Sequence, residues 1–418
     1  MILGAVVLVA VLLSAGFLER QKRQAAVPAL SLPDGETLPA GDNMVPGQTS
    51  PGGIVSEVFV EDTTGTDGGV GRLIRSMQGR SLEFYKTAAA PAGLIAANDI
   101  VLLKINSQWA ERGGTNTDLI RDVIQEVLNH PEGFSGEIIV ADNGQAQFGS
   151  SGTGGSLDWE RANAEDRGQS ALDVIRSFQV SGQRVTGVLW DGFTRLRVKE
   201  FNSGDMRDGF VVEDAVSSTG IAVSYPKFTT EFATHVSFKE GIWDPASLSY
   251  NSESLKVINM PVLKSHSQYQ VTAAVKSYMG VPSDMLTRSG GRAHNSIATG
   301  GLGTLMAQTR KPVLNILDMI WIGPDRGPSV SYNAAVRINK IAASVDPFAL
   351  DSWAATNVLI PEAAKLPGGR ARAMDPAGGE PGTFGYWMHL SMDELHKAGI
   401  AATMNPDEIL VIQNGNVQ

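Results

Sequence analysis

The sequence predicts an α/β protein whose mostly parallel sheet carries helices on both faces. From residue 54 onward, short apolar runs alternate with amphipathic helical patterns, which is typical of strands joined by crossover helices. With 418 residues, of which 42% are hydrophobic and 19% charged, the chain can bury a large core. We therefore expect an α/β domain at 54–418, a flexible Pro/Gly-rich linker at 25–53, and a signal peptide or membrane anchor at 1–24.

The first segment is apolar enough to be directed to a membrane. Ile2 to Leu18 is an uninterrupted run of apolar and small residues, about 26 Å long as a helix and slightly short of a hydrocarbon core. A signal peptide with a small-residue cleavage region at 14–16 and a short anchor both fit this run. The basic residues follow the run instead of preceding it, an arrangement that favours a cytoplasmic domain. On balance we expect an extracytoplasmic protein, periplasmic or membrane-anchored, with the side of the membrane left open.

The best-defined part of the domain is a strand–helix–strand unit. Ile100 to Ile105 is a continuous apolar run, typical of a buried strand. Apolar residues then recur on one helical face from Leu119 to Leu128. Glu137 to Ala141 is the next expected strand, and the turn residues 142–144 end it. Residues 150–155 are rich in Gly and Ser, but no strand leads into them, so they predict a surface loop and not a nucleotide-binding loop.

The other elements are less regular, and residues 156–250 define no topology. We expect helices at 171–178, 270–279, 347–358 and 392–398, and strands at 184–190, 220–225, 255–259, 313–317, 338–345 and 408–412. Right-handed crossovers would bring the carboxyl ends of the main strands to one side of the sheet. These ends fall near Lys104, Asp142, Asn259, Asp318 and Val345.

Charge and cysteine content narrow the possible functions. Lys and Arg number 34 against 44 Asp and Glu, a net charge of -10 that argues against nucleic-acid binding. The chain has no cysteine. Disulfides, thiolate catalysis, Cys-ligated zinc and an iron–sulfur cluster held by this chain are therefore excluded.

The most unusual stretch places two lysines and a histidine around one expected helix start. Lys264 and His266 precede a helix expected from about Ser267, and Thr272 and Lys276 would share a face of that helix. This grouping suits a carboxylate or phosphate ligand, or a lysine whose proton affinity is lowered by a neighbouring cation. Surface lysines and a histidine that bonds to the helix entry would give the same pattern.

Three aspartates stand at the ends of expected strands, where open α/β sheets form their ligand crevice. Asp142, Asp318 and Asp346 are candidates to hold a divalent metal ion or to act as acid and base. Each has a structural alternative, and Asp346 followed by Pro347 is a good helix cap. Asp351, inside that helix, is interpreted as a solvated or locally paired side chain.

Lys104 and Asn106 lie at the same predicted edge and, with Thr272, are candidate binding groups. A lysine at a strand end also reaches solvent in many proteins, so a structural role for Lys104 stays open. Four other histidines lack metal-ligand spacing and are interpreted as surface or internally bonded residues. They are His235, His294, His389 and His396.

Five blocks of the chain, taken in order, resemble the family catalogued as domain of unknown function 362. They are Lys104-Ile105-Asn106, Ala141-Asp142, Pro261 to His266, Thr272 to Gly280, and Asp346 to Asp351. The resemblance covers about residues 55–415 and implies an α/β fold with a shared site at Lys264, His266 and Lys276. It implies no reaction. Ser277 stands where the family usually has asparagine, and the Cys-rich ferredoxin-like segment of many members is missing, so we expect no electron transfer.

Two functions are therefore carried forward. The first is an enzyme or enzyme-like pocket in which the lysines and the histidine contact a small anion, with the strand-end aspartates as metal ligands or proton carriers. Whether it catalyses a reaction is left undecided. The second is a non-catalytic scaffold or assembly subunit of an envelope complex, attached to the membrane through the N-terminal segment.

Overall fold

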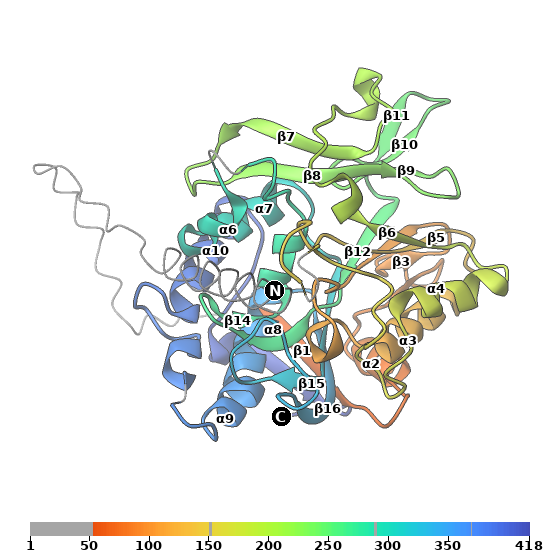
Figure 1. The fold of residues 1–418 in the computed structure, drawn as a ribbon. Coiled ribbons are helices and arrows are strands. Elements are labelled where there is room, and N and C mark those ends of the chain that lie inside the picture. Colours follow the sequence, from red (N-terminus) through yellow and green to blue (C-terminus); the bar gives the residue numbers. More distant parts are fainter. Residues whose placement is uncertain (1–52, 150–152, 288–290, 369) are drawn as a thin grey trace, which may run out of the picture. The chain divides into compact units, whose positions relative to one another are not determined.

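The structure is a computed structural model that describes residues 53–149, 153–287, 291–368 and 370–418 (Figure 1). The predicted signal peptide or anchor at 1–24, and all but the last residue of the predicted linker at 25–53, lie outside these residues. Within the described part of the chain, no helix combines the length and the apolar character needed to cross a membrane.

A large mixed sheet is the centre of the described chain. Its strands are β1 (Ser56–Asp62), β4 (Ile100–Lys104), β5 (Glu137–Asp142), β6 (Val185–Leu189), β12 (Leu255–Asn259), β13 (Val262–His266), β14 (Gln270–Thr272), β15 (Leu314–Gly323), β16 (Val336–Ser344), β17 (Ile409–Gln413) and β18 (Asn416–Val417). The order is β18-β17-β1-β16-β15-β12-β4-β5-β6, with β13 paired to β15 and β14 paired to β13. From β15 to β6 all neighbours are parallel. The predicted α/β class and the largely parallel sheet are confirmed.

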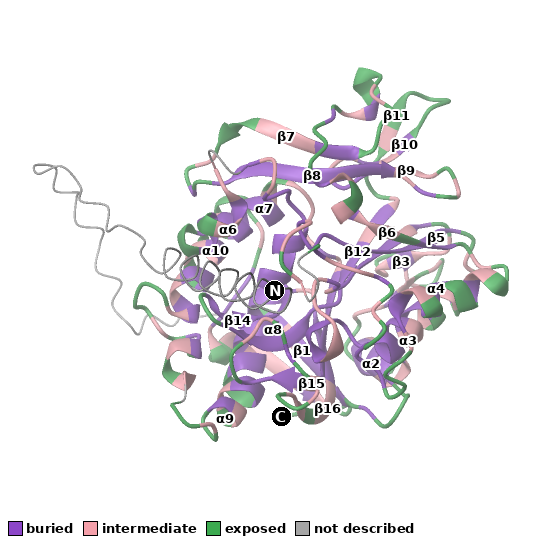
Figure 2. Ribbon diagram, in the orientation of Figure 1, coloured by how far each residue is buried: buried purple, intermediate pink, exposed green. Residues whose placement is uncertain are grey.

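Helices cover the two faces of this sheet. Those of the described chain are α2 (Val70–Gln78), α3 (Thr117–Leu128), α4 (Ala171–Val180), α5 (Ala274–Ser277), α6 (Ala293–Ser296), α7 (Gly301–Gln308), α8 (Pro347–Ala354), α9 (Ile360–Ala363) and α10 (Phe384–Lys397). Apolar side chains of α2, α3 and α4 form one core cluster, and those of α5, α7, α8 and α10 belong to another. In β5, Ile138 and Val140 join the first cluster, whereas Ile139 and Ala141 join the second. Burial on both faces explains why this strand is continuously apolar (Figure 2).

The direction of β16 differs from the prediction. β15 and β16 pair antiparallel, and the connection between them, residues 324–335, contains no helix that would carry the chain across the sheet. The carboxyl end of β16 near Val345 therefore lies at the opposite edge from the ends of β4, β5 and β12. The expectation that all five strand ends point one way is wrong for this strand, and Asp346 is separated from Asp142.

A second sheet accounts for the region whose topology the sequence left open. It is antiparallel, in the order β11-β10-β9-β8-β7. Its strands are β7 (Gly209–Val216), β8 (Ala222–Thr229), β9 (His235–Ser237), β10 (Gly241–Asp244) and β11 (Ser249–Asn251). Phe210, Phe228 and Phe238 from this region join the same core cluster as α7 and α10, so the second sheet packs on the rest of the domain (Figure 1). A short parallel pair, β2 (Tyr85–Lys86) and β3 (Ile95–Ala96), stands apart.

The helix expected at 270–279 is in fact a hairpin followed by short helical turns. β13 and β14 pair antiparallel, α5 begins only at Ala274, and a 3-10 turn, Tyr278–Gly280, ends the segment. Gln270, at the tight return, has a positive φ of 67°, which stops a helix from passing through it. The expected helix at 347–358 is α8 continued by a π-helix, Ala355–Leu359. Other 3-10 turns are Glu111–Gly113, Trp190–Phe193, Phe201–Ser203, Ile297–Thr299, Ala371–Met374 and Pro406–Glu408.

Side-chain caps begin several helices. The Asn116 side chain accepts hydrogen bonds from backbone N–H groups in the first turn of α3, and Ser170 forms a reciprocal capping box with Asp173 at α4. Asp346 caps α8, with Pro347 as its first residue. The structural alternative for Asp346 is therefore confirmed.

Candidate functional site

A cavity of about 320 Å³ opens at the carboxyl ends of β4 and β5. β13, β14, α5 and the 3-10 turn after it supply the facing wall. Its lining contains the polar and charged groups Lys104, Asn106, Gln108, Trp109, Asp142, Asn143, Gln145, Gln147, Lys264, His266, Ser267, Thr272, Lys276, Ser277 and His294.

The structure brings seven of the nine predicted site residues to this cavity. They are Lys104, Asn106, Asp142, Lys264, His266, Thr272 and Lys276. Lys264 and His266 are two residues apart in β13 and share one face of the strand, and Thr272 of β14 is the direct partner of Lys264. Strand geometry, and not the predicted helix start, is what groups these side chains.

Lys104 is fully engaged at the floor of the cavity. Its Nζ lies 2.9 Å from Asp142 Oδ1 and donates to the Ser277 hydroxyl at 2.9 Å and to the Ile105 carbonyl at 3.0 Å. Burial lowers the pKa of Lys104, and the Asp142 carboxylate acts in the opposite direction. Lys104 is 1% exposed, so the alternative of a lysine reaching solvent is wrong.

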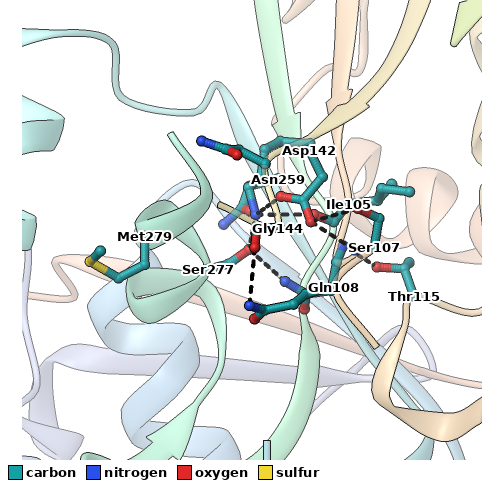
Figure 3. A network of polar contacts seen from close by, with 12 residues as sticks. Ile105, Ser107, Gln108, Thr115, Asp142, Gly144, Asn259, Ser277 and Met279 are labelled. Carbon is teal, nitrogen blue, oxygen red and sulfur yellow. Dashed lines mark hydrogen bonds and ion pairs between the residues drawn. The ribbon is translucent and has the colours of Figure 1, made fainter. Parts of the chain in front are cut away.

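Asp142 is held by the backbone as well as by Lys104. Its Oδ2 accepts from the Ser107 N–H at 2.7 Å and from the Ser107 hydroxyl at 3.1 Å (Figure 3). The Ser277 hydroxyl also accepts from Asn106 Nδ2 at 3.3 Å, and Asn106 Oδ1 accepts from the Val262 N–H at 2.9 Å. Ser277 therefore joins Lys104 to Asn106, and both ends of the Asn106 amide are used in hydrogen bonds within the fold.

Lys276 differs from Lys104 because its charge has no carboxylate partner. In the described chain its Nζ makes no hydrogen bond or ion pair, and it lies 5.7 Å from the centre of the Tyr269 ring. Burial and the nearby Lys104 lower the pKa of Lys276 to about 7. Lys264 donates to the Gly113 carbonyl, and burial together with Lys276 lowers its pKa to about 7 as well.

Two histidines line the same cavity beside the lysines. His266 Nδ1 accepts from the N–H groups of Gln268 and Tyr269, both at 3.1 Å, so in the neutral ring Nε2 carries the proton as a donor. Burial, followed by the charge of Lys276, lowers the pKa of His266. The His294 ring centre is 6.2 Å from that of His266, and the same two causes lower the pKa of His294 to about 3.

Sequence reasoning missed His294, which it assigned to the surface or to internal bonding. The contacts that bring it here are the Tyr269 hydroxyl, which donates to the His294 carbonyl at 2.7 Å, and Asp284, which accepts from the His294 N–H at 3.1 Å. Neither contact has a signal in the local sequence. Thr272 adds a buried hydroxyl that finds no hydrogen-bond partner within the described chain.

The aspartates predicted as metal ligands do not gather. Asp318 lies inside β15, where its carboxylate accepts from the N–H groups of Asn116 and Ile320, and burial raises its pKa to about 6. Asp346 accepts from the Ser56 hydroxyl and the Thr403 N–H at the far edge. Across the described ranges, no three His, Asp or Glu side chains are placed to hold a metal ion. These residues do not fit a divalent cation site.

Asp351 was interpreted as solvated or locally paired, and that interpretation is wrong. It is completely buried, and its two carboxylate oxygens accept from the N–H groups of Ala274 and Val275 at 2.7 and 2.8 Å. These are the first N–H groups of α5, which carries Lys276. Asp351 of α8 thus fixes the turn that presents the unpaired lysine, and burial raises its pKa to about 7.

The fold and the site together define a mixed α/β protein with a cation-lined cavity at the ends of parallel strands. The model of the family described as Domain of unknown function (DUF362) matches residues 249–356, which confirms the resemblance over these residues. The match contains the β13–β14 hairpin, α5 and Asp351, and it leaves out Lys104 and Asp142. No curated protein and no solved structure matches the chain.

Proposed function

We propose that the cavity binds a small organic anion through a carboxylate or phosphate group. The observation that carries this proposal is the Lys276 ammonium, which is 7% exposed and has no anionic partner in the described chain. A buried charge without a partner is strongly destabilising, and proteins keep such a group where a ligand or a reaction needs it.

The charge balance of the cavity supports an anionic ligand. Its lining contains three lysines and one carboxylate, that of Asp142, although the whole chain has a net charge of -10. Asp142 already faces Lys104. A ligand carboxylate or phosphate would supply the negative partner charge that Lys264 and Lys276 lack. It would also raise the pKa of both lysines.

The neutral donors around these lysines suit the same ligand. His266 Nε2 and the unbonded Thr272 hydroxyl line the cavity, and within the described chain Lys264 donates one hydrogen bond of the three that an ammonium can donate. Charge-assisted hydrogen bonds to a carboxylate or phosphate are the strongest that such groups make. The cavity volume of about 320 Å³ limits the ligand to a small molecule.

A thermal-shift titration tests this proposal. Acetate and inorganic phosphate are added to the full-length protein, to Lys276→Met and to Lys365→Met, whose lysine is 66% exposed in the turn after α9. Binding to the native state raises the melting temperature by mass action. We expect at least one anion to raise it in wild type and Lys365→Met, and to have a smaller effect in Lys276→Met. If all three variants respond equally, or none responds, the proposal is overturned and the scaffold function is favoured.

We further propose that the protein is associated with the cell envelope through residues 1–24. The apolar run from Ile2 to Leu18 supports this placement. Cell fractionation should find the full-length protein in the membrane or periplasmic fraction, and a variant without residues 1–24 in the cytosol. A native protein found only in the cytosol would show that this placement is wrong.

A further inference from the structure

The three cavity lysines are held in different ways. Lys104 uses its ammonium group on Asp142, Ser277 and Ile105. Lys264 is tied to the Gly113 carbonyl, and the Lys276 amine has no hydrogen bond or ion pair with any residue that the structure describes. Lys276 is therefore the lysine whose nitrogen lone pair is accessible from the cavity once the proton is lost.

The surroundings of Lys276 favour the neutral, nucleophilic form of the amine. It is buried beside Lys104, and a second cation next to a desolvated lysine is an arrangement that activates amines for attack on carbonyl groups. Asp351 holds the first turn of α5 through two backbone N–H groups, so the amine is presented from a fixed position. An unpaired structural lysine would need neither feature.

We propose that Lys276 forms an imine with the carbonyl group of a small oxo acid. This inference rests on the proposed function, because Lys264, His266 and Thr272 would bind the carboxylate of the same molecule. It adds to that function a substrate class, the oxo acids, and a nucleophile.

The step balances within the cavity. The neutral Lys276 nitrogen attacks the carbonyl carbon, a C–N bond forms, and the C=O electron pair moves to oxygen, which receives one of the two protons of the nitrogen. The hydroxyl of the resulting carbinolamine takes up a second proton and leaves as water while the nitrogen lone pair forms the C=N bond. The product is an iminium ion, which becomes the imine when it releases its last N–H proton. Lys264 is the neighbouring ammonium in the cavity that can protonate the leaving oxygen.

Reductive trapping tests the proposal. The full-length protein is incubated with sodium cyanoborohydride and glyoxylate, pyruvate or 2-oxoglutarate, and the modified lysines are identified by peptide mass spectrometry. We expect labelling at Lys276 at least about tenfold faster than at the exposed Lys365. The rate should pass through a maximum near pH 7, because Lys276 loses its proton there and Lys264 loses the charge that binds the carboxylate. Lys276→Arg keeps the charge and should lose the label.

Anion binding is measured in parallel by thermal shift with acetate, which has no reactive carbonyl group. Acetate binding without preferential labelling of Lys276 by any of the three oxo acids overturns the imine and leaves the anion site standing. If acetate does not bind and Lys276 is not labelled preferentially, both proposals are overturned. If excess acetate does not change the rate at which Lys276 is labelled, the nucleophile and the anion site are separate. The proposal that one substrate uses both is then overturned.

Discussion

Replacing Lys276 with methionine should stabilise the ligand-free protein. The unfolded lysine titrates near its ordinary pKa of 10.5, whereas burial and Lys104 hold the folded pKa at about 7. Each pKa unit corresponds to about 1.4 kcal/mol, so this pKa difference sets an upper limit of about 5 kcal/mol for the cost of burying the ammonium in the folded protein at low pH. Replacing buried charges by apolar groups of similar size has stabilised proteins by about 1–4 kcal/mol, which is the gain we expect here.

The pH dependence follows from the sign of the pKa shift. Between about pH 7 and 10.5 the unfolded lysine binds a proton that the folded lysine does not, so this group makes stability rise with pH. Below about pH 7 both states are charged and the full cost remains. The advantage of Lys276→Met should therefore be largest near pH 6 and small near pH 10.

Urea unfolding of the full-length protein at about pH 6 and about pH 10 measures both effects. Lys104→Met is the matched control, because it leaves the Asp142 carboxylate buried without its partner and should destabilise by about 3–5 kcal/mol. A Lys276→Met protein that is less stable than wild type at pH 6, or whose advantage does not change with pH, would refute the reasoning.

Three further predictions concern the surroundings of the cavity. Gly280→Ala would place a methyl group 2.5 Å from an oxygen of Asp142. It should lower the free energy of unfolding, measured by urea titration, by about 1–3 kcal/mol. In the control Gly192→Ala, the added methyl group meets no atom within 4 Å and should change the free energy of unfolding little. Asp351→Leu removes the acceptor of two buried N–H groups and should cost about 2–5 kcal/mol, with Asp351→Asn less damaging; equal stability of Asp351→Leu and wild type would contradict its role. Acetate affinity, measured by calorimetry, should fall as pH rises through about 7, because the two cavity lysines with a pKa of about 7 lose their charge there; an affinity that increases over this range would contradict the site.

Local sequence predicted the parallel part of the fold because its signals are local. β4 and β5 are buried on both faces, so they appear as continuous apolar runs, and α3 shows the spacing of a helix with one buried face. The cap formed by Asp346 and Pro347 was likewise legible, since it depends on adjacent residues. The Lys/His block stood out by composition, and the cavity contains it.

What the sequence could not determine depends on contacts between distant segments. The positive φ at Gln270 and the pairing of Lys264 with Thr272 turn an apparent helix into a hairpin, and β16 runs antiparallel because its connection lacks a crossover helix. Tyr269 and Asp284 bring His294 to the cavity, and the buried carboxylate of Asp351 reaches α5. Residue types alone therefore indicated which side chains could bind an anion, whereas only the tertiary structure decided which lysine has a carboxylate partner and which does not, because burial and charge pairing are properties of the packed chain.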